Sequence, residues 1–328
     1  SGTGIPAGSY IVSIDSPTSY TISQPATAAG SNSLTHTTSG TLDLNGLTNV
    51  LGKITINGFG TAIMGGTGVY ATNAALWNSS SNAASLSGAL TLGSNASVGG
   101  NGDLTLGEIN STTTQTLSKT GSNTLFLNTA NSSTLLGPIA LAAGVIKLGN
   151  AAALGAATSL ATDGTSLTSG ALLDLNGQTT SEFLSIAGAG RTNFTSARNT
   201  LGSVINSSTT SDATLSSAVV LSAAASIGSD YINAVSGGTA PMGINVNGAI
   251  SGAFVLSKVG SNTLKLTGAN TQSGLTLALG SVVVSGASGT TGSGPIIVNS
   301  GPVSDITPAN SLTLAYAAGA AVDRIAAN

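Results

Sequence analysis

A short phrase, in which an apolar, a polar and an apolar residue precede Gly or Asn-Gly, recurs along the chain. Residues 42–46 and 173–177 both read Leu-Asp-Leu-Asn-Gly, and residues 54–58 read Ile-Thr-Ile-Asn-Gly. Related copies lie at 104–107, 244–248 and, more loosely, 282–286. Alternation with a period of two places both apolar residues on one face of a strand. Asn-Gly tolerates a positive φ and lets the chain turn sharply. The phrase therefore predicts short strands, each followed by a turn.

These strands could be arranged in two ways. Asn-Gly between alternating strands is typical of hairpins, which would give antiparallel β-sandwich domains. A hairpin needs a matching strand directly after the Gly, whereas Gly46 is followed by Leu-Thr-Asn-Val-Leu-Gly and Gly248 by Ala-Ile-Ser-Gly-Ala. The pattern favours an all-β solenoid, in which each strand stacks on the equivalent strand of the next coil. The antiparallel β-sandwich is the alternative.

A longer repeat is superimposed on the short one. Residues 117–127 and 256–266 agree at nine of eleven positions, 139 residues apart, and both contain Leu-Ser-Lys. Ala-Ser-Val-Gly at 96–99 similarly resembles Ala-Ser-Ile-Gly at 225–228. Such self-similarity predicts two stacked units of about 130 residues. Lys119 and Lys258 occupy equivalent positions in them and are expected to point outward near a turn.

These repeats predict four segments. We expect solenoid units at residues 39–169 and 170–294, and C-terminal strands with a cap at residues 295–328. Residues 1–38 lack the repeated phrase, and an atypical terminal segment on a repeat array is usually a cap. An arm that pairs with a neighbouring molecule would have the same appearance.

The second copy of the long repeat resembles a known family. Residues 258–266 (Lys-Val-Gly-Ser-Asn-Thr-Leu-Lys-Leu), 269–274 (Ala-Asn-Thr-Gln-Ser-Gly) and 280–282 (Gly-Ser-Val) are similar to the passenger-associated repeat of bacterial autotransporters. This resemblance implies a right-handed parallel β-helix on a bacterial surface, in large proteins that are often adhesive or structural.

The composition predicts self-association and no nucleic-acid partner. Only 6% of the residues are charged, against roughly 25% in a typical soluble domain. The formal net charge is −3, and the Lys and Arg residues are scattered, so no basic patch for nucleic acid is predicted. A surface with so little charge opposes association weakly.

No apolar run reaches the roughly 18 residues of a membrane-spanning helix. The chain begins Ser-Gly-Thr and is expected to be a mature or excised segment.

No group of residues predicts catalysis. The β-helix hydrolases and lyases need converging carboxylates, but no two of the eleven acidic residues are adjacent or one residue apart. We expect solvated surface carboxylates, with Asp43 and Asp174 as equivalent outward strand residues. The only histidine, His36, and the absence of cysteine leave no ligand set for zinc or copper.

Three further motifs resemble binding sites but are better interpreted as structural features. Gly-Gly-Asn-Gly-Asp at 99–103 is similar to a calcium-binding nonapeptide but occurs once, so a plain glycine turn is favoured. The glycines at 66–71 resemble a dinucleotide-binding pattern but lack a following helix. Trp77 and Tyr70 could stack on a sugar ring, although a local minicore in an insertion loop is the favoured interpretation.

The sequence therefore predicts a non-enzymatic protein with no catalytic, cofactor or metal site. We expect an extracellular structural protein, a self-associating solenoid subunit of a bacterial surface fibre, matrix or surface layer. Its expected partner is another copy, bound through the solenoid ends or the N-terminal segment. An adhesin passenger that binds glycans or host surfaces is the alternative, and a polysaccharide-active enzyme is less favoured.

Overall fold

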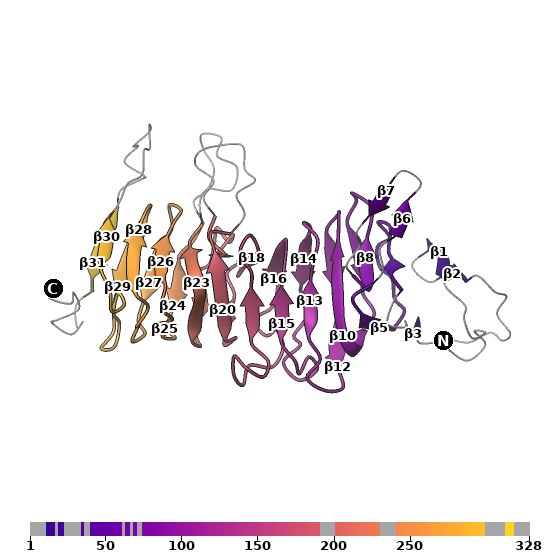
Figure 1. Cartoon of the computed structure of the whole chain (residues 1–328), viewed down its shortest axis with the longest axis horizontal. Coiled ribbons are helices and arrows are strands. Elements are labelled where there is room, and N and C mark those ends of the chain that lie inside the picture. The colour runs from indigo at the N-terminus through magenta and orange to yellow at the C-terminus, as the bar shows by residue number, and fades with distance from the viewer. Residues whose placement is uncertain are drawn as a thin grey trace. The chain divides into compact units, whose positions relative to one another are not determined.

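The computed structural model describes residues 40–60, 74–190, 201–229, 241–298 and 312–317 in full. It also describes the backbone of five strands outside these ranges, namely β1 (Ile11–Ser16), β2 (Ser19–Ile22), β3 (Leu34–Thr35), β6 (Ile63–Gly65) and β7 (Gly68–Tyr70). All regular elements of the described residues are strands (Figure 1). The chain divides into two compact units, residues 1–163 and 164–328.

In unit 1 the strands form three parallel ladders, and one passage of the chain through all three is a coil. The first ladder contains β4 (Leu42–Asp43), β8 (Leu76–Asn78), the end of β10 (Leu90–Gly100), β13 (Leu117–Lys119) and β15 (Ile139–Leu141). The second contains β9 (Ala84–Leu86), β11 (Leu104–Leu106), β14 (Thr124–Leu127) and β16 (Val145–Leu148). The third contains β3, β5 (Ile54–Gly58), the start of β10 and β12 (Ile109–Ser111).

Unit 2 repeats this arrangement. Its first ladder contains β18 (Leu172–Asp174), β21 (Val204–Ile205), the end of β23 (Val219–Ile227), β26 (Val255–Lys258), β28 (Gly274–Leu277) and β30 (Ile296–Val298). The second contains β19 (Thr179–Thr180), β22 (Ala213–Leu215), β24 (Ile244–Val246), β27 (Thr263–Leu266), β29 (Ser281–Val284) and β31 (Thr313–Tyr316). The third contains β17 (Thr165–Leu167), β20 (Leu184–Gly188), the start of β23 and β25 (Ile250–Ser251).

The predicted all-β solenoid is confirmed, and the sandwich alternative is wrong. The ladders are parallel, and within the described strands antiparallel pairing is confined to β1 with β2 and β6 with β7. The predicted turns are also present. Asn45 and Gly46 have φ of 45° and 78°, and Asn176 and Gly177 have 47° and 76°. These turns carry the chain from one ladder to the next instead of reversing it into a hairpin.

The core lies inside each coil and consists of stacked aliphatic side chains. In the second ladder of unit 1, Leu104 lies beside Leu125, and both side chains are fully buried. Each fully buried Leu of this kind stabilises the fold by about 1.5–3 kcal/mol. Polar residues alternate with them on the outside, as the period-two pattern predicts.

Candidate functional site

The repeated Leu-Ser-Lys phrase places a lysine inside the core of each unit. In β26, Leu256 points inward, Ser257 outward and Lys258 inward, and Lys258 is fully buried. Its Nζ donates to the carbonyl oxygens of Val259 and Gly260, both at 2.6 Å, and to that of Leu279 in the next coil at 3.2 Å. Three acceptors match the three donors of a protonated lysine. We call this arrangement a lysine cradle.

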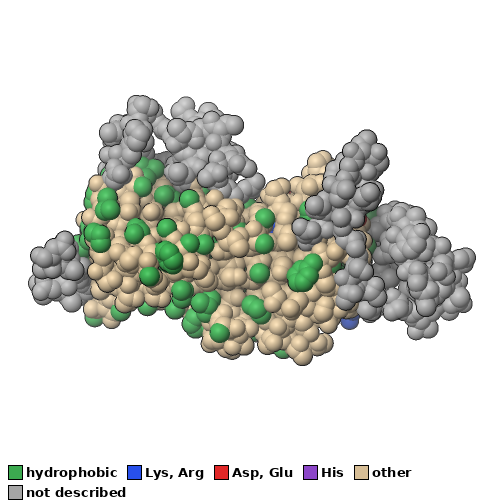
Figure 2. Space-filling model, in the orientation of Figure 1, with side chains coloured by type: hydrophobic (Ala, Val, Ile, Leu, Met, Phe, Trp, Pro, Cys, Tyr) green, Lys and Arg blue, Asp and Glu red, His purple; other side chains and the backbone are tan. Residues whose placement is uncertain are grey.

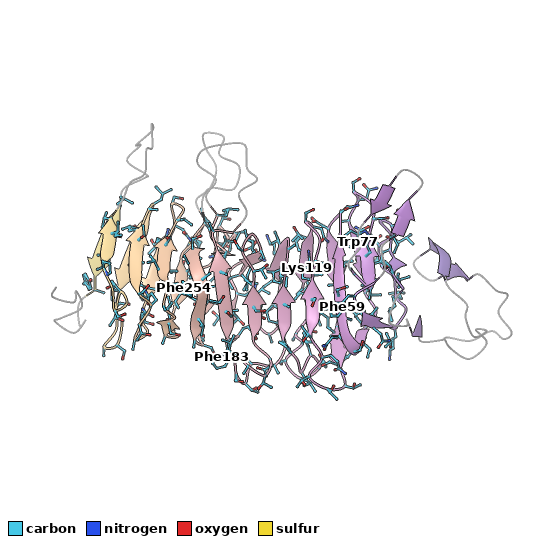
Figure 3. All side chains as sticks on the ribbon, viewed as in Figure 1. Phe59, Trp77, Lys119, Phe183 and Phe254 are labelled. Carbon is cyan, nitrogen blue, oxygen red and sulfur yellow. The ribbon has the colours of Figure 1, made fainter. Side chains whose placement is uncertain are left out.

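Unit 1 contains the same cradle. Lys119 on β13 is fully buried (Figure 3). Its Nζ donates to the carbonyl oxygens of Thr120 (2.6 Å), Gly121 (3.1 Å) and Ala143 (3.3 Å). The expectation that Lys119 and Lys258 point outward is therefore wrong. Both lie at inward strand positions because the amino group at the end of the long side chain reaches the turn carbonyls.

A glycine of the following coil closes each cradle. Gly280 has a φ of 77°, and a Cβ atom there would lie 2.5 Å from the Gly260 carbonyl oxygen and 2.9 Å from Lys258 Nζ. Gly144 occupies the same place against Gly121 and Lys119 in unit 1. Both cradles therefore require a glycine, for its φ and for the close approach of the backbone.

An asparagine beside each cradle makes different hydrogen bonds in the two units. Asn262 accepts a hydrogen bond from the Ser229 N–H (2.9 Å) and donates to the Met242 carbonyl (3.1 Å). Its counterpart Asn123 is equally buried, but both of its amide atoms lack a hydrogen bond within the described part of the chain. Gly100 stands where unit 2 has Ser229, because each lies two residues after the strand residue that pairs with the lysine, Val98 in unit 1 and Ile227 in unit 2.

A second duplicated cluster fixes the Asn-Gly turns. Asp174 Oδ1 accepts from the N–H groups of Asn176 and Ser207, both at 2.9 Å. Asn206 Oδ1 accepts from the Gly177 N–H (2.8 Å), and its Nδ2 donates to the carbonyl of Gly243 (2.9 Å). The Asp174 and Asn206 side chains thus tie each turn to the coils beside it.

Asp43 and Asn78 do the same in unit 1. Asp43 Oδ1 accepts from Asn45 and Ser79, and Asn78 Oδ1 accepts from Gly46, each at 2.9 Å. Both aspartates therefore act as turn caps. Asp43 is partly exposed, but Asp174 is buried, so the solvated position expected for Asp174 is wrong.

Two other carboxylates are buried, which also corrects the expectation of a solvated surface set. Glu182 accepts from the Thr165 hydroxyl at 2.8 Å. Asp163 accepts from the N–H groups of Thr158 and Ser159 and from the Thr158 hydroxyl, at 2.6–3.0 Å. Glu108 and Asp212 are exposed as expected, whereas Asp15, Asp230, Asp305 and Asp323 have side chains outside the described residues.

The hydrogen bonds to Asp163 predict an acid-sensitive contribution to stability. Burial would raise the pKa of this carboxyl, but the bonds from Thr158 and Ser159 outweigh it and lower the pKa below its ordinary value of 3.8. The stabilisation is therefore complete above that value and is lost as pH falls through the lowered folded-state pKa. The free energy of unfolding, measured by urea denaturation between about pH 6 and pH 2, tests this prediction. Asp163→Asn is expected to lower stability at pH 6 and to flatten the acid limb.

Thr158→Val is the matched variant, because it removes the hydroxyl donor and keeps the carboxylate. We expect its acid limb to be smaller than in the wild type and to end at higher pH, because loss of the hydroxyl donor raises the folded-state pKa towards the ordinary value. Identical acid limbs in wild type and Asp163→Asn would contradict this account.

The other sequence candidates do not form a shared site. Trp77 lies on β8 and is buried in a ladder, so its expected place in an insertion loop is wrong, and the Tyr70 side chain lies outside the described residues. Asp103 Oδ1 in the glycine turn accepts from the Thr124 N–H at 2.9 Å. Within the described ranges, no three His, Cys, Asp or Glu residues cluster in a way that could hold a metal ion. His36 and residues 66–67 are not described.

Comparison with protein-family models, with curated proteins and with solved structures finds no match for this chain. The resemblance to the autotransporter repeat stays a prediction. No helix among the described residues is long and apolar enough to cross a membrane.

Proposed function

We propose that the chain is an extracellular structural protein that self-associates through its β-solenoid, as a subunit of a bacterial surface fibre, matrix or surface layer. The observation that supports this most is the incomplete burial of the core at the last described strands of unit 2. Val298 on β30 is 56% exposed, although its register partner Leu277 is 1% exposed. Exposed apolar side chains of this kind favour association with another surface.

The scarcity of charge supports the same proposal. Figure 2 shows one face of the molecule, on which the described side chains are almost all apolar or uncharged. Association of such surfaces depends on apolar burial and main-chain hydrogen bonds, which salt screens little. The polar clusters described above are occupied in turns and cradles, which fits a scaffold better than an enzyme.

Sedimentation velocity with electron microscopy tests the proposal on the whole chain at micromolar concentration. We expect oligomers or polymers whose fraction rises with protein concentration and changes little between low and high salt. Monomers throughout the concentration series would contradict the proposal.

A second candidate, glycan adhesion, has one observation in its favour. Thr55, Thr91 and Asn110 stand side by side on the outer face of the third ladder in unit 1. Such a row of hydroxyl and amide groups could donate to and accept from sugar hydroxyls. Binding of the folded chain to a glycan array distinguishes this candidate, because self-association alone predicts no glycan signal.

A further inference from the structure

The described residues include five Asn-Gly pairs, whose glycine N–H groups are held in different ways. In an Asn-Gly pair the glycine nitrogen can attack the side-chain carbonyl carbon of the asparagine, because glycine has no Cβ to hinder the approach. The attack requires a glycine nitrogen that is free to leave its hydrogen bond. The pairs lie at residues 45–46, 57–58, 101–102, 176–177 and 247–248.

Two of the glycine N–H groups are held by a buried asparagine. Gly46 donates to Asn78 Oδ1 at 2.9 Å, and Gly177 donates to Asn206 Oδ1 at 2.8 Å. Both acceptor side chains are fully buried, and each also donates to main-chain carbonyls. The aspartate and asparagine clusters that fix these turns therefore also restrain the nitrogen that would attack.

Two further pairs are restrained at other atoms. Gly58 N–H donates to Ser94 Oγ at 3.1 Å, which again holds the attacking nitrogen. Asn101 is exposed, but its Nδ2 donates to the Ser79 carbonyl at 3.2 Å, and Gly102 beside it is buried. This bond ties the Asn101 amide to a neighbouring coil.

The turn between β24 and β25 is held less firmly. Asn247 is exposed, and the N–H of Gly248 lies 3.4 Å from the Leu215 carbonyl oxygen, which already accepts from the Asn247 N–H at 2.8 Å. A hydrogen bond of this length is weak. Thr267 Oγ1 donates to Asn247 Oδ1 at 2.9 Å. This bond polarises the side-chain carbonyl and would stabilise negative charge that develops on its oxygen.

We propose that Asn247 is a site of spontaneous modification, at which the chain converts its own asparagine into isoaspartate and aspartate. The Gly248 nitrogen forms a bond to Asn247 Cγ, the bond from Cγ to Nδ2 breaks, and Nδ2 leaves as ammonia with the proton of the glycine nitrogen. Water then opens the cyclic imide at either carbonyl. The product has a new carboxylate, and isoaspartate also lengthens the main chain at this turn. This chemistry needs no second copy of the chain and is independent of the proposed function.

Warm incubation of the whole chain at mildly alkaline pH, followed by peptide mass spectrometry, tests the proposal. Conversion is measured at all five asparagines, as the mass gained when an amide becomes a carboxyl group. We expect Asn247 to convert first, about tenfold faster than Asn45 and Asn176, whose glycine nitrogens must first leave a buried acceptor. The chain in urea is the control, because unfolding removes these hydrogen bonds and the five sites should then convert at similar rates.

Thr267→Val removes the hydroxyl donor and keeps the shape of the side chain. We expect conversion of Asn247 to become roughly three- to tenfold slower, while conversion of Asn57 and the circular dichroism stay those of the wild type. A hydroxyl that only restrained the amide would give faster conversion instead. An unchanged or faster rate in this variant would overturn the activation by Thr267. Earlier conversion of any other Asn-Gly pair in the folded wild type would overturn Asn247 as the site.

Discussion

Replacing Lys258 by methionine is expected to lower the free energy of unfolding by about 3 kcal/mol, measured by urea denaturation at neutral pH. Methionine keeps most of the side-chain volume, so little cavity forms. The carbonyls of Val259, Gly260 and Leu279 nevertheless lose a common donor. Each carbonyl left unsatisfied in a buried place costs about 1–3 kcal/mol, and partial hydration near Leu279 reduces the sum. The free energy lost with three hydrogen bonds should be larger than the free energy gained by no longer burying a charged group.

Lys265→Met is the matched control. Lys265 is on the adjacent strand β27 of the same unit but is exposed, so its replacement should change stability by less than about 0.5 kcal/mol. A Lys258→Met protein as stable as Lys265→Met would show that the carbonyls find water or other donors. The cradle would then have no net stabilising role.

Gly280→Ala is expected to destabilise the fold by about 3 kcal/mol or more, from two additive causes. A residue with a side chain in the left-handed region costs about 1–2 kcal/mol. The added methyl group would also lie 2.5 Å from the Gly260 carbonyl oxygen and 2.7 Å from that of Asn262. The Gly260 carbonyl cannot move away without breaking its bond to Lys258, and the Asn262 carbonyl accepts from the Ser281 N–H.

Gly170→Ala separates the two causes. Gly170 has a φ of 88°, but no heavy atom lies within 4 Å of a Cβ atom built there. The alanine at this position should therefore cost only the conformational term, about 1–2 kcal/mol. Equal losses of unfolding free energy in the two variants would contradict a clash at the cradle.

The regular part of the fold could be predicted because its causes are local. Alternation in phrases such as Leu-Thr-Leu at 104–106 determines which side chains enter the core, and positive φ at Asn45 and Gly46 follows from their chemistry. The equivalence of residues 96–99 and 225–228 was also visible in the sequence, and both segments pair with a Leu-Ser-Lys strand.

The lysine cradles were missed because charge was given more weight than periodicity. Lys119 lies two residues after the buried Leu117, so the same alternation that identifies the core also places Lys119 inside. What the sequence does not contain is the position of the Ala143 carbonyl, 24 residues away in the next coil. That position depends on the length of each coil.

The buried carboxylates were missed for a related reason. Asp174 is an outward residue of its strand, yet it is buried, and it accepts from the Ser207 N–H of the next coil. A strand pattern describes two faces and does not tell which parts of the outer face are covered by neighbouring turns. The positions of the aspartate turn caps therefore could not be predicted without knowing how the coils stack.

The corner strands β10 and β23 have a consequence for how the protein unfolds. Each runs without interruption through two ladders, the third at its start and the first at its end. A simple repeat array can open one face or one repeat at a time, because each contact is made only with the nearest neighbour. A strand shared by two ladders couples their local unfolding, because its detachment from one ladder also breaks hydrogen bonds in the other. Each unit should therefore exchange its amide protons around its corner strand as a single cooperative block.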